Sequence, residues 1–237
     1  MKQTLSKQSY ADLDIVNRKE KAVKILKVLF DFGVKKGDNL LEIGTGSGII
    51  SNELSMFFKV NSVDVVDERV IKDGYKFKIV KDTNLSFVNN HFDVIVSNQV
   101  IEHVDDYINH LKEIFRCLKK GGICYLATPN KFAVFEAHYR LPFLSWLPKR
   151  WADFYLKLFF KKKYDVFPLS YLYLIKLCKS TGFETNHISL SVLRNPVKFG
   201  LDNKYFKFSR LINLFPIKLD WLISFILPSW IFILRKN

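Results

Sequence analysis

The clearest pattern in this sequence is a short apolar run that ends in closely spaced glycines. The stretch LLEIGTGSGIIS, residues 40–51, joins a buried-strand pattern to an apolar helix start, with Gly44, Gly46 and Gly48 between them. Glycine leaves the backbone bare, so it permits a left-handed turn or the close approach of another group. A strand, a glycine-rich turn and a helix in this order are typical of α/β folds that bring main chain against a nucleotide.

Apolar residues recur at helical spacing in four segments and at strand spacing in seven. The predicted helices are residues 18–33, 49–58, 105–122 and 169–182. The predicted strands are residues 39–43, 59–66, 75–82, 91–98, 123–130, 183–193 and 230–236. Residues 67–73 are only weakly helical in pattern. Because strands and helices alternate up to residue 130, right-handed crossovers predict a doubly wound, mostly parallel α/β sheet.

One predicted helix carries a detailed expectation about its buried face. In DDYINHLKEIFRCLKKGG, residues 105–122, the helix should close at Gly121. Its inward side chains should be Tyr107, Ile108, Leu111, Ile114, Phe115 and Leu118.

The chain divides into two parts of different character. Residues 1–130 carry 19 Lys and Arg against 17 Asp and Glu, a balance of +2. Residues 131–237 carry 18 against 6, a balance of +12. We expect one domain over residues 1–237, with a binding core at 38–130. A basic, aromatic-rich second part is typical of a surface that meets anions, although a solvated lysine-rich surface gives the same composition.

Cysteine content and apolar runs limit the class of protein. Cys117, Cys124 and Cys178 form no C-x-x-C pair, so neither a disulfide framework nor a metal site is expected, and a reducing cytoplasm fits best. The N-terminal MKQTLSKQSYADLD lacks the apolar region of a secretory signal. The longest apolar run, residues 221–234, contains Pro228 and is too short to span a bilayer.

The acidic residues near the glycine stretch limit the class of ligand that it can bind. The spacing is E-x-G-x-G-x-G rather than G-x-G-x-x-G, and no lysine is present, which excludes a P-loop. Glu42 would repel a pyrophosphate but suits a ligand that carries a cation. Asp64 follows Gly44 by 20 residues, the spacing that places a carboxylate on ribose hydroxyls. Asp82 ends the third strand and is a candidate acceptor for an adenine amino group.

Four motifs in order resemble the class I S-adenosylmethionine (SAM) dependent methyltransferases, particularly the group similar to ubiquinone-biosynthesis methyltransferases with a type 11 methyltransferase domain. The motifs are LLEIGTGSG, VNSVDVVDERV, VKDTNLSFVNNHFDVIVSNQVIEHVDD and LKKGGICYLATPN, within residues 38–130. The resemblance implies a Rossmann-like sheet of seven strands, SAM as cofactor, and a final antiparallel strand that WIFILRK would supply.

The resemblance also implies residue roles. The methionyl part of SAM would lie against Gly44, Gly46 and Gly48, and Glu42 would orient the loop or meet the ammonium group through water. The ribose and the adenine would be bound by Asp64 and by Asp82 with the backbone of Thr83. The sulfonium would lie near Asn98 and Gln99.

Methyl transfer from an activated sulfonium needs mainly alignment of donor and acceptor, but an oxygen acceptor can also need a base to take its proton. His103, in IEHV after the fourth strand, is the first candidate and His138, in EAHYRLPF, is the second. A structural role, such as capping a helix or lying in an ordinary loop, remains open for both. The remaining histidines show no such arrangement.

The acceptor is suggested by two segments that we call the first insertion, residues 131–164, and the second insertion, residues 195–228. Both interleave Phe, Trp, Leu and Ile with Lys and Arg, as segments at a membrane interface do. The first insertion also resembles the corresponding region of bacterial methyltransferases of cell-surface glycan and lipid pathways. We expect the two to pack together as helical lids over the acceptor site.

These features predict O-methylation of a small or lipid-linked acceptor, namely a glycan, polyprenyl or quinone compound. The protein would then be cytoplasmic and would touch the inner face of an anionic membrane. In the alternative the apolar residues are lid core and the cations are solvated. Two further alternatives are an RNA methyltransferase, because aromatics and cations can bind nucleic acid, and a non-catalytic SAM-binding protein.

Overall fold

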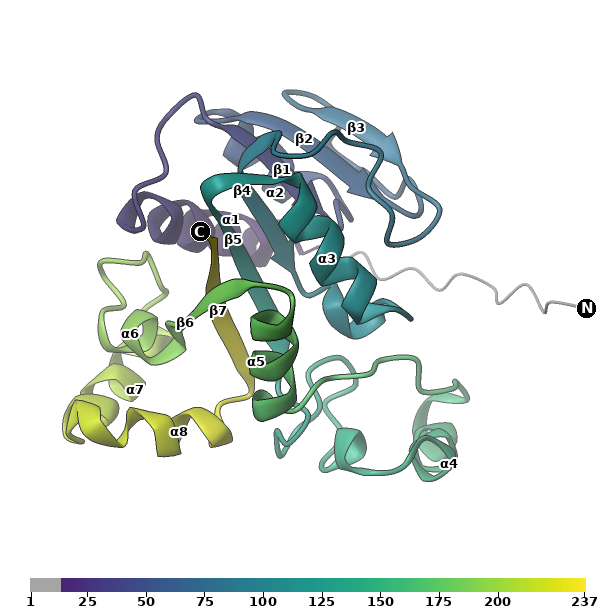
Figure 1. The fold of residues 1–237 in the computed structure, drawn as a ribbon. Helices are drawn as coiled ribbons and strands as arrows, with labels where there is room; N and C mark the ends of the chain where they lie inside the picture. The colour runs from purple at the N-terminus through teal and green to yellow at the C-terminus, as the bar shows by residue number, and fades with distance from the viewer. Residues whose placement is uncertain (1–13) are drawn as a thin grey trace, which may run out of the picture.

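The protein is described here by a computed structural model of residues 14–237, which form a seven-stranded sheet with helices on both faces (Figure 1). The stretch considered for a secretory signal lies almost wholly in residues 1–13, outside the described residues. The strands are β1 Asn39–Ile43, β2 Lys59–Asp64, β3 Lys76–Ile79, β4 Phe92–Asn98, β5 Leu118–Pro129, β6 Phe183–His187 and β7 Ser229–Lys236. Their order is β3-β2-β1-β4-β5-β7-β6, and only β7 pairs antiparallel with its neighbours. This confirms the predicted doubly wound, mostly parallel fold.

Helices cover both faces because the central strands are apolar on both sides. The α-helices are α1 Ile15–Asp31, α2 Ile49–Ser55, α3 Tyr107–Cys117, α4 Lys149–Phe160, α5 Tyr171–Ser180, α6 Ser189–Arg194, α7 Lys204–Asn213 and α8 Asp220–Ile226. Three short 3-10 turns are η1 Ile101–His103, η2 Leu144–Trp146 and η3 Ile217–Leu219. Leu40 belongs to the core cluster that includes residues of α1 and α2, whereas Leu41 belongs to the other cluster, which includes residues of α3 and α5, as strand alternation requires.

Two helix predictions are wrong in position. Residues 67–73 contain no helix, and the loop instead packs back on the glycine turn through the Val70 amide, which donates to the Ser47 carbonyl at 2.9 Å. Helix α3 ends at Cys117 rather than at Gly121, and β5 begins at the next residue. The helical pattern misleads here because Leu118 already pairs with β4, and the strand bulges through the left-handed Gly121.

Three smaller corrections follow from tertiary packing. Ile108 of α3 is 44 % exposed because it lies off the buried stripe, which is formed by His110, Leu111, Ile114 and Cys117. The predicted strand 183–193 is strand β6 followed by helix α6. The apolar run 221–234 is helix α8 and strand β7, separated by Pro228. No helix in the described residues has the length and hydropathy needed to cross a membrane.

The two insertions are separate units, so the prediction that they pack together is wrong. The first insertion has its own small core, formed by Leu144, Ala152, Leu156, Tyr164 and Val166. The second insertion supplies α7 and α8, which pack against α6. Figure 1 shows α4 at one end of the lower edge and α7 with α8 at the other. Whether either insertion covers an acceptor stays a prediction.

The first insertion is nevertheless tied to the strand ends. The Lys131 amide donates to the Leu169 carbonyl at 3.3 Å, which closes the base of the insertion. The Phe167 amide donates to the Glu102 carbonyl of η1 at 2.8 Å. The insertion therefore lies beside the segment that follows β4, at the carboxyl edge of the sheet, where ligands bind in open α/β folds.

Candidate functional site

The glycine turn between β1 and α2 rests on a buried carboxyl group. Glu42 is 1 % exposed and accepts a short hydrogen bond from the Ser51 hydroxyl of α2 and a long one, 3.5 Å, from Ser62 of β2. Burial raises the pKa of Glu42 to about 8, against the opposing effects of the Ser51 hydrogen bond and the charge of Arg18. Glu42 therefore joins β1, α2 and β2 through its hydrogen bonds, and its role toward SAM stays a prediction.

The three glycines of the turn all have positive φ but differ in what surrounds them. A Cβ on Gly44 would lie 2.5 Å from a methyl group of Val100, and one on Gly48 would lie 2.2 Å from the Ile71 carbonyl oxygen. A Cβ on Gly46 would find only the Arg18 guanidinium, at 3.6 Å. Protein packing thus accounts for the bare backbone at the two outer glycines, whereas a Cβ at Gly46 would meet no atom of the described residues closer than the Arg18 guanidinium.

Asp64 and Arg18 bring opposite charges close to Gly46. Asp64 ends β2, and its carboxylate accepts the Gly46 amide at 2.8 Å and the Val65 amide at 2.7 Å. Arg18 comes from α1, far away in sequence, and no motif indicated it. A turn with a carboxylate and a guanidinium close by suits a zwitterionic nucleoside such as SAM, which carries ribose hydroxyls, an ammonium group and a carboxylate.

The other predicted cofactor residues lie on neighbouring loops of the same edge. Asp82 is exposed and accepts the backbone and side-chain N–H groups of Asn84 at 2.7 and 2.8 Å. Thr83 accepts the side chain of Asn109 at 2.9 Å, which ties this loop to α3. Asn98 ends β4. Gln99 follows in a left-handed backbone conformation, and its backbone N–H donates to the Ala127 carbonyl. Their contacts with SAM stay a prediction.

The two candidate catalytic histidines, considered separately in the sequence, lie together. The rings of His103 in η1 and His138 in the first insertion are 5.0 Å apart, edge to face at 88°. Glu136 lies 3.0 Å from Nδ1 of His138, and Glu102 accepts Thr128 at 3.1 Å. Atoms of Glu102 and the two histidines lie within 4.8 Å of one another, a spacing that also suits one small cation, so the expected absence of a metal stays a prediction.

The surroundings separate the pKa values of the two histidines. Burial, helped by the charge of His138, lowers the pKa of His103 to about 4. Burial alone would lower the pKa of His138 as well, but its hydrogen bond to Glu136 and the charges of Glu136, Glu102 and Asp165 outweigh it, so this pKa is raised. Burial also raises the pKa of Glu102 to about 7. His103 is therefore neutral near pH 7, and His138 is the better proton acceptor.

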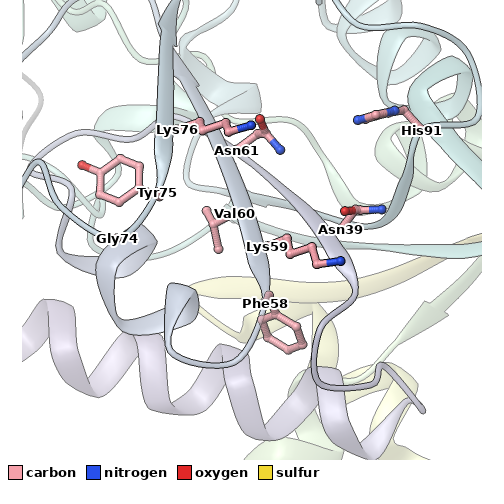
Figure 2. A pocket seen from close by; sticks show the side chains of 9 residues that line it. All are labelled: Asn39, Phe58, Lys59, Val60, Asn61, Gly74, Tyr75, Lys76 and His91. Atoms are coloured by element: carbon pink, nitrogen blue, oxygen red, sulfur yellow. The ribbon is translucent and has the colours of Figure 1, made fainter.

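A pocket of about 620 Å³ lies at the opposite edge of the sheet. Its lining includes Asn39, Lys59 and Lys76, which are the first residues of β1, β2 and β3. Figure 2 shows these side chains with Asn61 and His91 around the hollow. The glycine turn and the histidines follow the carboxyl ends of strands, so this pocket is not the candidate site.

The sheet order, the glycine turn on Glu42 and the carboxylate at the end of β2 together define a class I SAM-dependent methyltransferase. Comparison with known families supports this class, because a methyltransferase-domain model matches residues 16–188. The chain therefore belongs to the methyltransferase-domain family, and SAM is its cofactor.

Similar proteins include quinone-pathway methyltransferases and a SAM-bound structure. The chain is 30 % identical over 151 residues to a ubiquinone biosynthesis O-methyltransferase of Pelagibacter ubique, covering 55 % of this chain and 59 % of that protein. It is 28 % identical to a demethylmenaquinone methyltransferase of Staphylococcus aureus, covering 68 % and 70 %. A Haemonchus contortus phosphoethanolamine N-methyltransferase in complex with SAM shares the fold, with a TM-score of 0.56, 17 % identity, and 90 % and 52 % coverage. The matches span 50 to 59 % of the first three curated relatives' lengths.

Proposed function

We propose that the chain transfers a methyl group from SAM to an oxygen atom of a small or lipid-linked acceptor, such as a quinone precursor, a polyprenyl compound or a glycan. The observation that carries the proposal is the histidine pair at the carboxyl edge, where a base could take a hydroxyl proton. Curated relatives that are O-methyltransferases of quinone biosynthesis support the same chemistry.

The residues around the glycine turn are suited to hold SAM. Arg18 would bind its carboxylate, Asp64 its ribose hydroxyls, and Asp82 with the Thr83 backbone its adenine. Asn98 and Gln99 would lie near the sulfonium. When bound, SAM supplies an activated methyl group, so the chain's residues need only align the acceptor and manage its proton.

The surface of the first insertion supports an amphiphilic acceptor. Phe135, Trp151, Phe154, Leu158 and Phe159 are each at least 59 % exposed. Exposed lysines at 161–163 follow directly after α4. Aromatic side chains beside cations are typical of segments that lie in a membrane interface and attract anionic head groups. We therefore propose that the first insertion contacts the membrane that holds the acceptor.

Methyl transfer with labelled SAM tests the acceptor class. We expect transfer to a polyprenyl-substituted phenol in mixed vesicles, and much weaker transfer to a water-soluble catechol without the tail. Equal use of both acceptors would contradict the lipid-linked class and leave O-methylation standing. Salt-sensitive retention of RNA on filters, without transfer to any phenol, would favour the nucleic-acid alternative.

Sedimentation with vesicles tests the membrane contact. The protein should pellet with anionic vesicles at low salt and remain in the supernatant at high salt, because surface charges are screened beyond about 8 to 10 Å near physiological ionic strength. Replacing Lys161, Lys162 and Lys163 by Gln should weaken the binding, whereas replacing Lys78 and Lys81, exposed at the far edge of the sheet, should not. No binding at low salt would remove the membrane contact from the proposal.

A further inference from the structure

Glu136 is a buried carboxylate that holds the backbone and the ring of the same histidine. Its side chain is 1 % exposed. One oxygen accepts the amides of His138 at 2.7 Å and of Tyr139 at 2.6 Å, and the other contacts Nδ1 of His138 at 3.0 Å. A carboxylate with three such partners has little freedom, so it fixes the histidine ring in one orientation.

The turn that carries these two residues is itself closed by hydrogen bonds. The Glu136 amide donates to the Leu141 carbonyl at 3.0 Å, and the Arg140 amide donates to the Glu136 carbonyl at 2.9 Å. Just outside this turn, Phe143 donates to Val134 at 2.7 Å. The turn therefore presents the histidine from a braced hairpin rather than from a loose loop.

The braced histidine lies where an acceptor would arrive. Its side chain is 27 % exposed, and its ring meets His103, which lies three residues after Val100, the neighbour of Gly44 in the glycine turn. Because Nδ1 is engaged by Glu136, Nε2 is the nitrogen left for a ligand. The charged groups around the ring are Glu136 from its own turn, Glu102 of η1 and Asp165 before α5, while His103 is neutral. Three carboxyl groups favour the protonated ring that a base becomes.

We propose that Glu136 is a positioning residue which holds His138 with Nδ1–H toward the carboxylate, so that Nε2 takes the proton of a hydroxyl acceptor. This inference rests on the proposed O-methylation. The acceptor O–H bond breaks, and its proton goes to Nε2. The acceptor oxygen keeps that electron pair and forms the new bond to the methyl carbon. The pair of the broken carbon–sulfur bond stays on sulfur, and the products are the methyl ether, S-adenosylhomocysteine and a protonated histidine.

Nitrogen NMR of the full-length, histidine-labelled protein tests the positioning without any turnover. A His138→Gln variant identifies the signals. We expect the neutral ring to carry its proton on Nδ1, and its pKa to lie above that of an ordinary histidine. Glu136→Gln should lower this pKa, and the exposed Glu184→Gln in β6 should not change it. A proton on Nε2, or a pKa that Glu136→Gln does not move, would overturn the proposal.

Kinetics test whether the pair acts in the reaction. His138→Ala should reduce kcat by roughly 10² to 10⁴-fold, as expected for loss of a general base. Glu136→Gln should reduce kcat by at least about tenfold with nearly unchanged KM, and should move the acidic limb of the pH profile to lower pH. Unchanged rates in both variants, or activity that EDTA abolishes but Glu136→Gln does not affect, would overturn the assignment.

Calorimetry with SAM separates this inference from the proposed function. Wild type and Glu136→Gln should bind SAM equally, because Glu136 lies outside the glycine turn. If wild type binds SAM but methylates no hydroxyl acceptor, the proposed function fails whatever the NMR result. If wild type methylates a hydroxyl and His138 lacks the expected proton position, only the Glu136 inference fails.

Discussion

At the scale of single residues, the site depends on carboxyl groups whose surroundings differ sharply. Glu42 is buried beneath the glycine turn, and its raised pKa means that the folded protein holds a proton there near neutral pH. Asp64, one strand away, is half-buried and accepts two backbone amides. The first residue braces the turn, and the second is available to a ligand.

The buried Glu42 predicts a pH dependence of stability. Its pKa rises from 4.5 to about 8 on folding, so between these values the folded protein binds more protons than the unfolded chain. The free energy of unfolding should therefore fall as pH rises from about 5 to 8, by at most about 1.4 kcal/mol per pH unit from this group. Glu102 acts in the same direction.

Urea unfolding of wild type and Glu42→Gln at pH 5.5 and 8 measures this effect. The loss of stability between the two pH values should be smaller in Glu42→Gln, because glutamine does not titrate. Glu53→Gln, on the same helix as Ser51, is the matched control because Glu53 is not fully buried. The same pH dependence in wild type and Glu42→Gln would contradict the assignment.

Residues with regular spacing were predictable from the sequence, and residues placed by tertiary contacts were not. Glu42 and Asp64 could be predicted from their sequence separation from the glycines, because strand–turn–helix geometry is local. Arg18 and Glu136 reach the site from α1 and from the first insertion, and neither belongs to a motif. The fact that His103 and His138 touch depends on how the insertion folds back on η1.

At the scale of elements, the turn after β1 is locked by the loop after β2. The Val70 and Ile71 amides both donate to the Ser47 carbonyl, and the Tyr75 hydroxyl donates to the Ile71 carbonyl. The loop therefore lies directly over Gly48, where a side chain has no room. Gly46 lies in the same turn, but among the described residues no backbone packs against it, so alanine substitutions at Gly46 and Gly48 form a matched pair.

Alanine at these two glycines should separate stability from ligand binding. Gly48→Ala should lower the free energy of unfolding by about 1 to 3 kcal/mol or more, because its φ of +80° is strained for alanine and the Cβ meets a carbonyl oxygen. Gly46→Ala, also at a positive φ, should destabilise less because its Cβ would only come within 3.6 Å of the Arg18 guanidinium, but it should weaken SAM binding more. Urea unfolding measures the stability of both variants, and calorimetry measures their SAM affinity. A Gly46→Ala variant that is less stable but binds SAM better than Gly48→Ala would contradict this prediction.

The elements themselves were largely predictable up to residue 130 because each strand and helix there repeats its apolar spacing. The misplaced end of α3 shows the limit, since Leu118 satisfies the helix pattern and the sheet equally well. The prediction of a single strand over residues 183–193 was wrong for a related reason. Ser189 begins α6, and its hydroxyl group hydrogen-bonds to the His187 ring and accepts the Ile231 backbone N–H. Such side-chain bonding is not visible as periodicity.

At the scale of the whole molecule, the excess positive charge and the candidate SAM site lie in different parts of the chain. The near-neutral first 130 residues supply the glycine turn and most of the sheet, whereas the basic remainder supplies both insertions. The composition predicted this division, but it did not predict that the insertions occupy different ends of the lower edge (Figure 1). Only the first insertion contributes a histidine to the carboxyl edge, so it is the better candidate for acceptor contact.

SAM binding by groups that α1, β1 and β2 bring together is the central expectation for this protein. Isothermal calorimetry of SAM with wild type and Asp64→Ala tests this most directly, with Asp73→Ala, an exposed carboxylate in the adjoining loop, as control. Wild type and Asp73→Ala should bind SAM alike, and Asp64→Ala should bind more weakly by about 1 to 3 kcal/mol through lost ribose hydrogen bonds. Unchanged affinity in Asp64→Ala, or equal binding of NADH by the wild type, would contradict the account.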